Sequence, residues 1–538
     1  MNQQKNSVDE LVLQTAFEKP YVQYRAPKGH GEALISPPLT ETGQQLARNL
    51  KASNQTNFFE GLKTDARKQL LNAAKEYTGQ YRNLETIVGS WDEDAPIVMS
   101  GHQPTLFHAG VWFKNFALSK IANQQNAIPI NLVIDNDVAV GSSIRVPIVE
   151  SSTGKAHYQS IDFDHSGGGI PYEQTLLQDT ERFESFAERV LQCISPLVEN
   201  PCVDRLWIHA KEAMHDTRNT GEIFARARHS LEAECNLSTL EVPLSTVCES
   251  QSFYQFTLIL LSDAEELHQC YNNAVHHYRL AHGIRSNSHP VPDLRSQDNW
   301  LEIPFWIYGD DSPQRRPAWV SLTNGQLRIT DRISSERIID LKDPRESAEA
   351  LKSVLGPQFK LRPRALITTM YARLILSDLF LHGIGGGKYD QLGDQITRSF
   401  FKTEAPEYTV ISATTMLPLQ QDKTQRDTTH HLQRMIRDTI YQAETFAKDI
   451  DLPDTLIQEK QAMLQQIPRK GQRKSWHHKL ERINEQLASY LTARRAELRS
   501  DLRTLQIESA SNRILSNREH PFCLFNKNYL MQTFESML

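Results

Sequence analysis

A glycine-rich string is the segment of this sequence most suited to holding a ligand. HGIGGGKYD runs from His382 to Asp390 and places four glycines in five residues. Because glycine loses the most conformational freedom on folding, this composition indicates positive backbone dihedrals or the close approach of a ligand. The string lacks the GxxxxGK[ST] pattern of a P-loop, and a plain turn between two helices is the alternative. We predict a cradle for phosphate or carboxylate beside helix amides, made by His382, Gly383, Gly385, Gly386, Gly387, Lys388, Tyr389 and Asp390.

A second group of donors follows a short apolar run at 95–100. The loop Gly101-His102-Gln103-Pro104 comes directly after this run, and a helical pattern extends from Val111 to about Gln124. Glycine lets a ligand approach the backbone, and the start of a helix favours an anion. GxGxxG is absent, so ordinary dinucleotide binding is not indicated, and a structural loop with a capping histidine is the alternative. We predict a site with His102 as a catalytic residue and with Gly101, Gln103, His108, Lys114 and Asn115 as binding residues.

Two carboxylates close the next apolar run. The run at 128–135 reads IPINLVID and ends in Asp135-Asn136-Asp137. If the two runs form neighbouring parallel strands, these side chains lie at the same sheet edge as the first loop. Carboxylates there can bind a cation, position an amine or act as a general base, whereas a plain strand-end turn is the alternative. We predict catalytic roles for Asp135 and Asp137 and a binding role for Asn136.

Two arginines flank a proline in the string LRPRAL. Pro363 stiffens the presentation of Arg362 and Arg364, and a guanidinium binds carboxylate or phosphate in a bidentate manner. Surface salt bridging is the alternative. We predict that both arginines bind an anionic group.

Three histidine pairs invite a metal: His276-His277, His430-His431 and His477-His478. No cysteine or histidine stands near them at zinc-like spacing, so we predict no metal site. GxSxG, HExxH and the kinase signature set are absent from the sequence. Hydrolase, metalloprotease and kinase activities therefore lose their usual support.

The elements that must position these residues alternate between strands and helices. Strand, loop, helix and strand over 95–135 open a parallel α/β sheet. The run EYTVISATTMLPL at 407–419 predicts another strand, and LSTLEVPLS at 237–245 is a further candidate. The second α/β element follows the first by more than 200 residues, which indicates one discontinuous sheet rather than two domains. Before the glycine string, helical spacing is shown by Ile367, Tyr371, Leu374, Ile375 and Leu379.

The chain divides into segments of different composition. Residues 144–158 alternate like a sheet or hairpin, and turn chemistry at Thr323-Asn324-Gly325 indicates antiparallel strands. We predict a helical lead-in over 1–95, a discontinuous core over 96–420 with helical and β insertions at about 172–345, a helical arm over 421–515, and a tail over 516–538 that returns to the core.

The predicted arm carries regularly spaced leucines. Glycine nearly vanishes beyond Gln420, and PRKGQRK is a plausible turn. Spacings of three, four and seven predict a long amphipathic helix with coiled-coil character and a homodimer through these helices. An intramolecular helical hairpin would give the same pattern. The repeating residues are Leu480, Ile483, Leu487, Leu491, Leu498, Leu502 and Leu505.

Charge and cysteine content narrow the class of partner. The chain has 59 basic and 65 acidic residues, and a net charge of -6 is too mild to indicate a nucleic-acid or membrane partner. It offers no run of roughly 18 uncharged residues that could span a bilayer. Its six cysteines form no CxxC pair, so neither a disulfide framework nor a zinc knuckle is suggested. We predict a cytoplasmic protein with reduced thiols and a small-molecule substrate.

The order of these pieces resembles bacillithiol synthase. The matching stretches are SGHQPTLFHAGVWFKNFALSKIA, IPINLVIDND and LRPRALITTMYARLILSDLFLHGIGGGKYD, and the region after His430 is similar to the dimerisation arm of that family. His102 stands where the family has glutamine, Asp135-Asn136-Asp137 replaces an acidic string with histidine, and the glycine run replaces a shorter loop. Because these departures fall in the predicted site, a shared fold follows more readily than a shared substrate.

The resemblance implies an α/β fold with a Rossmann-like parallel sheet core, inserted segments and a C-terminal coiled-coil arm. It also implies a ligase that joins cysteine, or a related amino acid, to an amino-sugar conjugate through an amide. Two functions remain as alternatives: a nucleotide-dependent ligase or nucleotidyl transferase with another substrate, and a catalytically silent scaffold. ATP and ADP are the candidate cofactors. A common site requires that Gly101 to Gln103, Asp135 to Asp137 and the glycines at Gly385 line one cleft.

Overall fold

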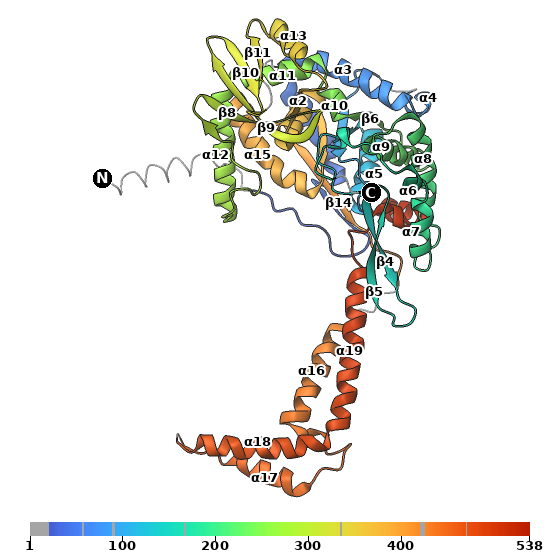
Figure 1. Ribbon diagram of the computed structural model, residues 1–538, viewed down its shortest axis with the longest axis vertical. Helices are drawn as coiled ribbons and strands as arrows, with labels where there is room; N and C mark the ends of the chain where they lie inside the picture. The colour runs from blue at the N-terminus through green and yellow to red at the C-terminus, as the bar shows by residue number, and fades with distance from the viewer. Residues whose placement is uncertain are drawn as a thin grey trace, which may run out of the picture. The chain divides into compact units, whose positions relative to one another are not determined.

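The chain forms two compact units in a computed structural model. The model describes residues 21–55, 59–88, 92–165, 168–333, 336–419, 425–469 and 471–538. The first unit is a mixed α/β unit, and the second is mainly helical (Figure 1). The first unit comprises Met1–Arg145, Ser160–Thr415 and Arg518–Leu538, and the second comprises Val146–Gln159 and Met416–Asn517.

The first unit is built on one six-stranded sheet. β1 pairs with β14 in antiparallel fashion, and all other neighbours in the sheet are parallel. The predicted strands at 95–100, 128–135, 237–245 and 407–419 are confirmed, and they do belong to one sheet. Its order is β1 (Glu32–Ser36), β14 (Tyr408–Thr414), β13 (Leu379–His382), β2 (Ile97–His102), β3 (Ile128–Val133) and β6 (Leu240–Pro243).

Helices cover both faces of this sheet, which explains why its strands are nearly continuous apolar runs. Ile97 and Met99 of β2 pack into a large cluster that includes side chains of α3 (Glu60–Gly79) and α11 (Gln251–Ser262). The other face packs on α5 (Ala109–Gln124), which lies against β2, β3 and β14.

The tail joins the core on the α5 face. Trp112 of α5 packs on Phe522, with ring centroids 4.6 Å apart, and Phe113 packs on Phe534 of α20 (Lys527–Met537) at 5.4 Å. These four aromatic side chains are fully buried. Burial of aromatic rings of this size contributes strongly to stability, so the tail is an integral part of the first unit.

The helical pattern predicted up to Leu379 is wrong at its end. α14 (Ala365–Tyr371) passes into a π-helical turn (Ala372–Leu376), and Leu379 then begins β13. All four residues of β13 are buried. A short apolar run that is buried on both sides cannot be told from a buried helix by periodicity alone.

The glycines after β13 do not adopt the positive dihedrals that their number suggests. Gly383 caps α15 (Ile384–Phe401) with a φ of -76°, and the other three glycines lie in the first helical turn. Gly387 is required for packing, because a Cβ there would overlap Val410 of β14. Close approach of β14, rather than a left-handed backbone, therefore explains this position.

A second, antiparallel sheet is inserted between β6 and β13. Its order is β11-β10-β9-β8-β12, with β7 (Ser296–Gln297) pairing beside β8. Asn324 and Gly325, with φ of 54° and 77°, make the predicted hairpin turn. The strands are β8 (Trp300–Gly309), β9 (Ser312–Thr323), β10 (Gln326–Thr330), β11 (Glu336–Asp340) and β12 (Lys360–Pro363).

The remaining helices of the first unit lie mostly between β5 (Ala156–Asp162) and β7, where helical insertions are predicted from about residue 172. A short 3-10 turn at Tyr172–Gln174 precedes them. They are α6 (Thr180–Glu184), α7 (Phe186–Ile194), α8 (Val203–Asp216), α9 (Thr220–Ala233), α10 (Leu244–Val247) and α12 (Ala264–His282), and elsewhere in the unit α2 (Thr42–Gln55), α4 (Glu85–Val88) and α13 (Pro344–Val354).

The second unit is a helical arm with its own small core. The single long helix predicted over the leucine repeat is wrong, because α18 (Arg473–Tyr490) and α19 (Thr492–Leu515) meet at the buried Leu491. No glycine or proline between these helices marks the break. The core consists of Ala443, Phe446, Ile483, Leu487 and Leu491, and the other elements are α16 (Gln425–Tyr441) and α17 (Asp454–Gln465).

A β-hairpin contributes to this arm. The predicted hairpin is confirmed as β4 (Ser143–Val149) and β5 (Ala156–Asp162), and residues 146–159 group with the helices. The backbone N–H of Ala156 donates to Ser511 Oγ of α19 at 2.9 Å. The arm is thus assembled from two segments of the chain.

Two further predictions bear on the chain as a whole. All six cysteines are free thiols, and five of them are buried. Among the described residues, no helix is both long and apolar enough to cross a membrane.

Candidate functional site

The strand order reverses at the carboxyl end of β2. β3 and β6 follow on one side of it, and β13 and β14 follow on the other. In open parallel sheets, ligands bind outside the carboxyl ends of the strands at such a reversal. His102, Asp135 and His382 lie at or just beyond the ends of β2, β3 and β13, so three of the predicted groups share one sheet edge.

The first two predicted loops touch each other. Gln103 Nε2 donates to Asp137 Oδ2 at 2.9 Å, as neighbouring parallel strands predict. The other carboxylate oxygen of Asp137 accepts from Arg315 of β9 at 3.0 Å. Asp137 therefore connects the main sheet to the inserted sheet, and both of its oxygens already have donors. Asn136 makes a similar connection by donating to the carbonyl of Pro363 at 2.8 Å.

Lys114 is a buried amine at this edge. Its Nζ donates to the carbonyl of Gly101 at 2.6 Å. Burial, with repulsion from Arg228 as a smaller cause, lowers the pKa of Lys114 to about 7. Gly101 itself is needed by the sheet, because a Cβ there would lie 3.1 Å from the carbonyl oxygen of Leu132.

His102 is a neutral imidazole in this setting. Burial, followed by repulsion from Arg228 and Lys114, holds the pKa of His102 well below its ordinary value. Its Nδ1 lies 3.1 Å from the carbonyl oxygen of Gln103, which fixes Nδ1 as the protonated nitrogen. Its ring also packs edge-on against Phe107 at 4.6 Å.

His108 is a helix cap. Its Nδ1 accepts from the backbone N–H of Gly110 at 3.1 Å at the start of α5. Burial lowers the pKa of His108, which keeps Nδ1 available as an acceptor. A structural loop with a capping histidine was the alternative to a ligand site here, and His108 is that capping histidine.

An acidic cavity of about 370 Å³ opens at the carboxyl ends of β3 and β6. Asp135 accepts hydrogen bonds from the backbone N–H of Ser245, at 2.9 Å, and from its Oγ. Burial first, and the Glu173 carboxylate second, raise the pKa of Asp135 to about 7. The polar residues that line the cavity are Tyr77, Gln80, Asp135, Glu173, Asn219, Glu222, Ser245, Thr246 and Glu249.

Arg362 reaches the acidic residues of this cavity. It binds both oxygens of Glu173, at 3.1 and 3.2 Å, and Glu249 at 3.1 Å. Glu222 pairs with Arg226 through its Oε1. Two arginines thus face four carboxylates, and the cavity retains an excess of negative charge that favours a cationic group such as an ammonium.

Arg364 lies away from the cavity, under the inserted sheet. Its NH2 donates to Glu302 Oε1 at 2.6 Å, and its guanidinium lies 4.1 Å from the centroid of the Trp306 ring. Both partners hold it rigidly in a buried position. Salt bridging is what Arg364 does in this structure, although inside the protein rather than on its surface.

The glycine string presents the start of α15 at the same sheet edge. Gly385 and Gly386 are exposed, and the N-cap residue is Gly383, which has no side chain that could cap the helix. Lys388 makes no ion pair within the described part of the chain, and Tyr389 packs near His289 with ring centroids 6.1 Å apart. The backbone amides of this turn and Lys388 supply the donors expected of an anion cradle.

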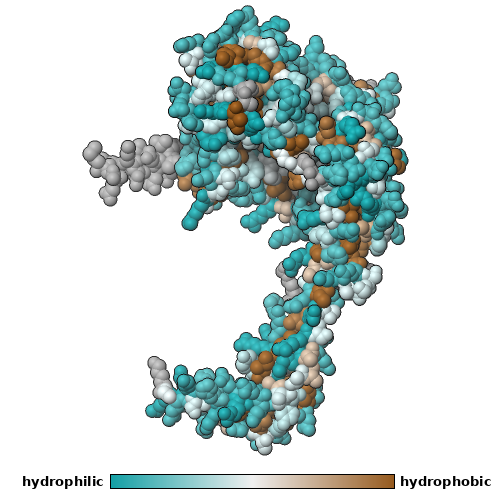
Figure 2. Space-filling view, in the orientation of Figure 1, coloured by the Kyte–Doolittle hydropathy of each residue, from teal (hydrophilic) through white to brown (hydrophobic). Residues whose placement is uncertain are grey.

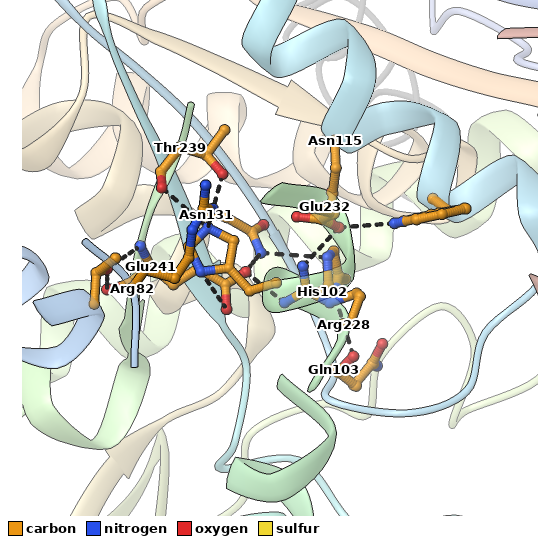
Figure 3. Close-up of polar contacts among 12 residues, drawn as sticks. Arg82, His102, Gln103, Asn115, Asn131, Arg228, Glu232, Thr239 and Glu241 are labelled. Atoms are coloured by element: carbon orange, nitrogen blue, oxygen red, sulfur yellow. Dashed lines mark hydrogen bonds and ion pairs between the residues drawn. The ribbon is translucent and has the colours of Figure 1, made fainter. Parts of the chain in front are cut away.

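A buried polar network lies behind the first loop (Figure 3). Glu232 Oε1 accepts from Trp112, at 2.8 Å, from Asn115, at 2.6 Å, and from Arg228, at 2.8 Å. Asn115, predicted to bind a ligand, therefore binds this network instead. Arg228 also donates to Glu241 of β6.

Part of this network has the composition of a metal site. His229, Glu232 and Glu241 offer ligand atoms within 4.8 Å of one another. Arg228 binds both glutamates, and Arg82 approaches His229 Nε2 at 2.7 Å. Because two guanidinium groups already balance the two carboxylates, a divalent cation would meet strong repulsion here. The donor set fits a structural ion network better than a metal centre.

The chain matches no model of a known protein family and no curated protein.

Several residues at the carboxyl edge of the main sheet were not predicted from the sequence. Glu173 and Arg315 come from loop and strand segments far from the motifs, and their positions depend on tertiary packing. Ser245 could have been identified, because it is the last residue of the run at 237–245 as Asp135 is the last residue of the run at 128–135. The same strand-end argument that indicates Asp135 would therefore have indicated Ser245.

Proposed function

We propose that this protein is an amide-forming ligase, similar to bacillithiol synthase, which joins cysteine or a related amino acid to an amino-sugar conjugate. The observation that carries the proposal is the acidic cavity with Asp135 at its wall. We also propose a Rossmann-like core, since β6-β3-β2-β13-β14 follow the order 3-2-1-4-5 of that fold.

The chemistry of amide formation fits the groups at this edge. The reaction needs an activated acyl group, a neutral amine close to it and donors for the developing oxyanion. An amino-sugar enters the cavity as an ammonium, which the excess of carboxylates attracts. Asp135, with a pKa of about 7, accepts a proton from it and leaves the amine nucleophilic. The start of α15 supplies amides for the cysteine carboxylate, and ATP is the proposed source of its activation. The amine then attacks the activated carbonyl carbon, and the phosphate or nucleotide group leaves as the amide bond forms.

A product assay tests this function. Purified protein is incubated with cysteine, glucosaminyl malate and ATP, and the amide is detected by mass spectrometry. Asp135→Asn is expected to lower kcat by about 10²–10⁴, the usual effect of losing a general base. Asp204→Asn, an exposed position on α8, is the matched control and should leave the rate unchanged.

Two results would contradict the proposal. One is the absence of amide from the wild-type protein with cysteine and with related amino acids. The other is an unchanged rate in Asp135→Asn, which would remove the cavity from the reaction.

We further propose that the protein acts as a cytoplasmic homodimer, assembled through the helical arm. The six free thiols suit a reducing compartment. Several large apolar side chains of the arm remain exposed, and Figure 2 shows apolar residues at its surface. Such residues suit a contact with a second copy of the chain.

A further inference from the structure

His382 is held in a single tautomer at the end of β13. The side chain is 3% exposed, and its Nε2 lies 2.9 Å from Asp390 Oδ2. Asp390 also accepts from Arg373 and Thr369. Burial opposes ionisation of Asp390, but Arg373 and His382 outweigh it and hold the pKa of this carboxyl below its ordinary value. An ionised carboxylate on Nε2 keeps the proton on that nitrogen and leaves Nδ1 as an acceptor.

The acceptor nitrogen faces the glycine turn. A Cβ built on Gly386 would lie 2.7 Å from His382 Nδ1, so glycine at this position leaves the nitrogen uncovered by a side chain. No hydrogen bond to Nδ1 is formed within the described part of the chain. Gly385, one residue earlier, has nothing within 4 Å of the corresponding position. A side chain at position 386 would therefore cover Nδ1 of His382, whereas a side chain at position 385 would not, although both glycines are exposed.

The same turn also carries backbone donors. The first backbone hydrogen bond of the helix runs from Gly387 N–H to the Gly383 carbonyl at 2.9 Å. The amides of Ile384, Gly385 and Gly386 precede it, at the N-terminus of an 18-residue helix without a side-chain cap. Such amides favour a carboxylate or phosphate. A simple anion would satisfy them and leave Nδ1 without a partner.

We propose that this turn is a subsite for a free α-amino acid, whose carboxylate accepts from the first-turn amides of α15 and whose ammonium donates to His382 Nδ1. An α-amino acid carries both groups on adjacent positions, so it satisfies donors and acceptor together. The inference rests on the proposed ligase function and deepens it, since it identifies the site of the amino-acid substrate. His382 is then a specificity-determining residue, and Asp390 and Arg373 are positioning residues that act through it.

Calorimetry on the full chain tests the subsite with three small ligands. Cysteine has both groups, 3-mercaptopropionate lacks the amine, and cysteamine lacks the carboxylate. We expect cysteine to bind about tenfold or more tightly than either analogue, because each leaves part of the subsite unpaired. Equal binding of cysteine and 3-mercaptopropionate would show a general anion site and would overturn the inference.

Two glycine substitutions locate the subsite. Gly386→Ala places a methyl group against His382 Nδ1 and is expected to weaken cysteine binding about tenfold or more. Gly61→Ala, in the first turn of α3, is the matched control, because it brings the same gain in helix propensity with open space for its methyl group, and it should bind cysteine as the wild type does. Unchanged affinity in Gly386→Ala would contradict the proposal.

A measurement on the wild-type protein covers the case in which Gly386→Ala does not fold. In ¹⁵N-histidine spectra, the unprotonated Nδ1 signal of His382 should shift when cysteine is added and should not shift with 3-mercaptopropionate. A cysteine-dependent shift without any amide product would leave the subsite standing and remove the ligase. Amide formation without a shift at His382 would support the ligase and overturn the subsite.

Discussion

Asp135 and Lys114 are buried ionisable side chains of opposite type at one sheet edge. Burial is the main cause of both shifts, and it raises the pKa of Asp135 and lowers that of Lys114 to about 7 in each case. Each group can therefore gain or lose a proton near neutral pH. Groups poised in this way are typical of sites that transfer protons, which is why this edge of the sheet is the best candidate for chemistry.

The raised pKa of Asp135 predicts a pH-dependent stability. In the unfolded chain this carboxyl ionises near pH 3.8, whereas in the folded protein it keeps its proton up to about pH 7. The folded state therefore binds more protons in this window, and the free energy of unfolding falls as the pH rises from about 4 to 7. Asp135→Asn should flatten this dependence by about 3 kcal/mol, measured by urea unfolding at pH 4.5 and 8.

The Glu173 carboxylate contributes to the raised pKa of Asp135, so this pH dependence also relies on the contact between the two residues. Asp204→Asn, outside the cavity, should keep the wild-type pH dependence. A similar slope in Asp135→Asn and the wild type would show that Asp135 is ionised throughout this range.

The sequence indicates Asp135 but not its surroundings. A strand that ends in aspartate places that residue at the carboxyl edge whatever the rest of the chain does. The pKa of Asp135 depends on Glu173 and Arg362, which are brought beside it by a loop and by an inserted strand. No local pattern encodes those contacts, so the acidic cavity could not be predicted from the motifs.

At the scale of elements, Glu232 holds α5 and α9 together. Its Oε1 receives three hydrogen bonds from Trp112, Asn115 and Arg228, and the residue is 1% exposed. Glu232→Ala leaves the Trp112 and Asn115 donors without an acceptor and leaves Glu241 as the remaining carboxylate partner of the buried Arg228 guanidinium. We expect it to lower the free energy of unfolding by about 3–5 kcal/mol, measured by urea denaturation.

Glu212→Ala is the control for this prediction, since Glu212 lies on the exposed side of α8. It should change stability by less than about 0.5 kcal/mol. A loss below about 1 kcal/mol in Glu232→Ala would mean that water or rearranged side chains replace the carboxylate.

Element type was predictable where periodicity and length agree. β2, β3 and α5 carry long, clear patterns, and the strand-helix-strand order follows from them. β13 was missed because its three buried apolar residues, Leu379 to Leu381, follow a helix and continue its pattern. The break at Leu491 was missed for a related reason, since a buried leucine fits the helical repeat on either side of it.

At the scale of the whole molecule, the order of the pieces is more informative than any single motif. β2 and β13 are adjacent although more than 250 residues separate them in the chain. A sheet of this kind can accept long insertions between strands, because each insertion leaves the strand pairing unchanged. The inserted sheet in turn supplies Arg315 and Arg362 to the carboxyl edge. The insertions therefore complete the site that the main sheet begins.

The leucine repeat allows either a coiled coil between two chains or a helical hairpin within one chain, and the structure of the arm distinguishes them. Ile483, Leu487 and Leu491 pack within one copy of the chain, so these residues are not available to a partner. A homodimer must then use side chains that remain exposed, such as Ile467 and Tyr490, which are 66% and 52% exposed. The leucine repeat thus reflects the internal packing of the arm, and the proposed dimer would use the outer surface of the arm.

Surface and core substitutions in the arm separate these roles. Ile467→Asp should weaken the dimer in sedimentation equilibrium and leave the helical content unchanged, because Ile467 is largely outside the core. Leu487→Ala should instead destabilise the arm by about 2–5 kcal/mol, seen as an earlier loss of helical signal on heating. Val140→Asp, at a 90% exposed apolar position of the first unit, should leave the dimer intact. A mass of 61.5 kDa at all concentrations of the wild-type chain would show a monomer, and the arm would then serve a function other than self-assembly.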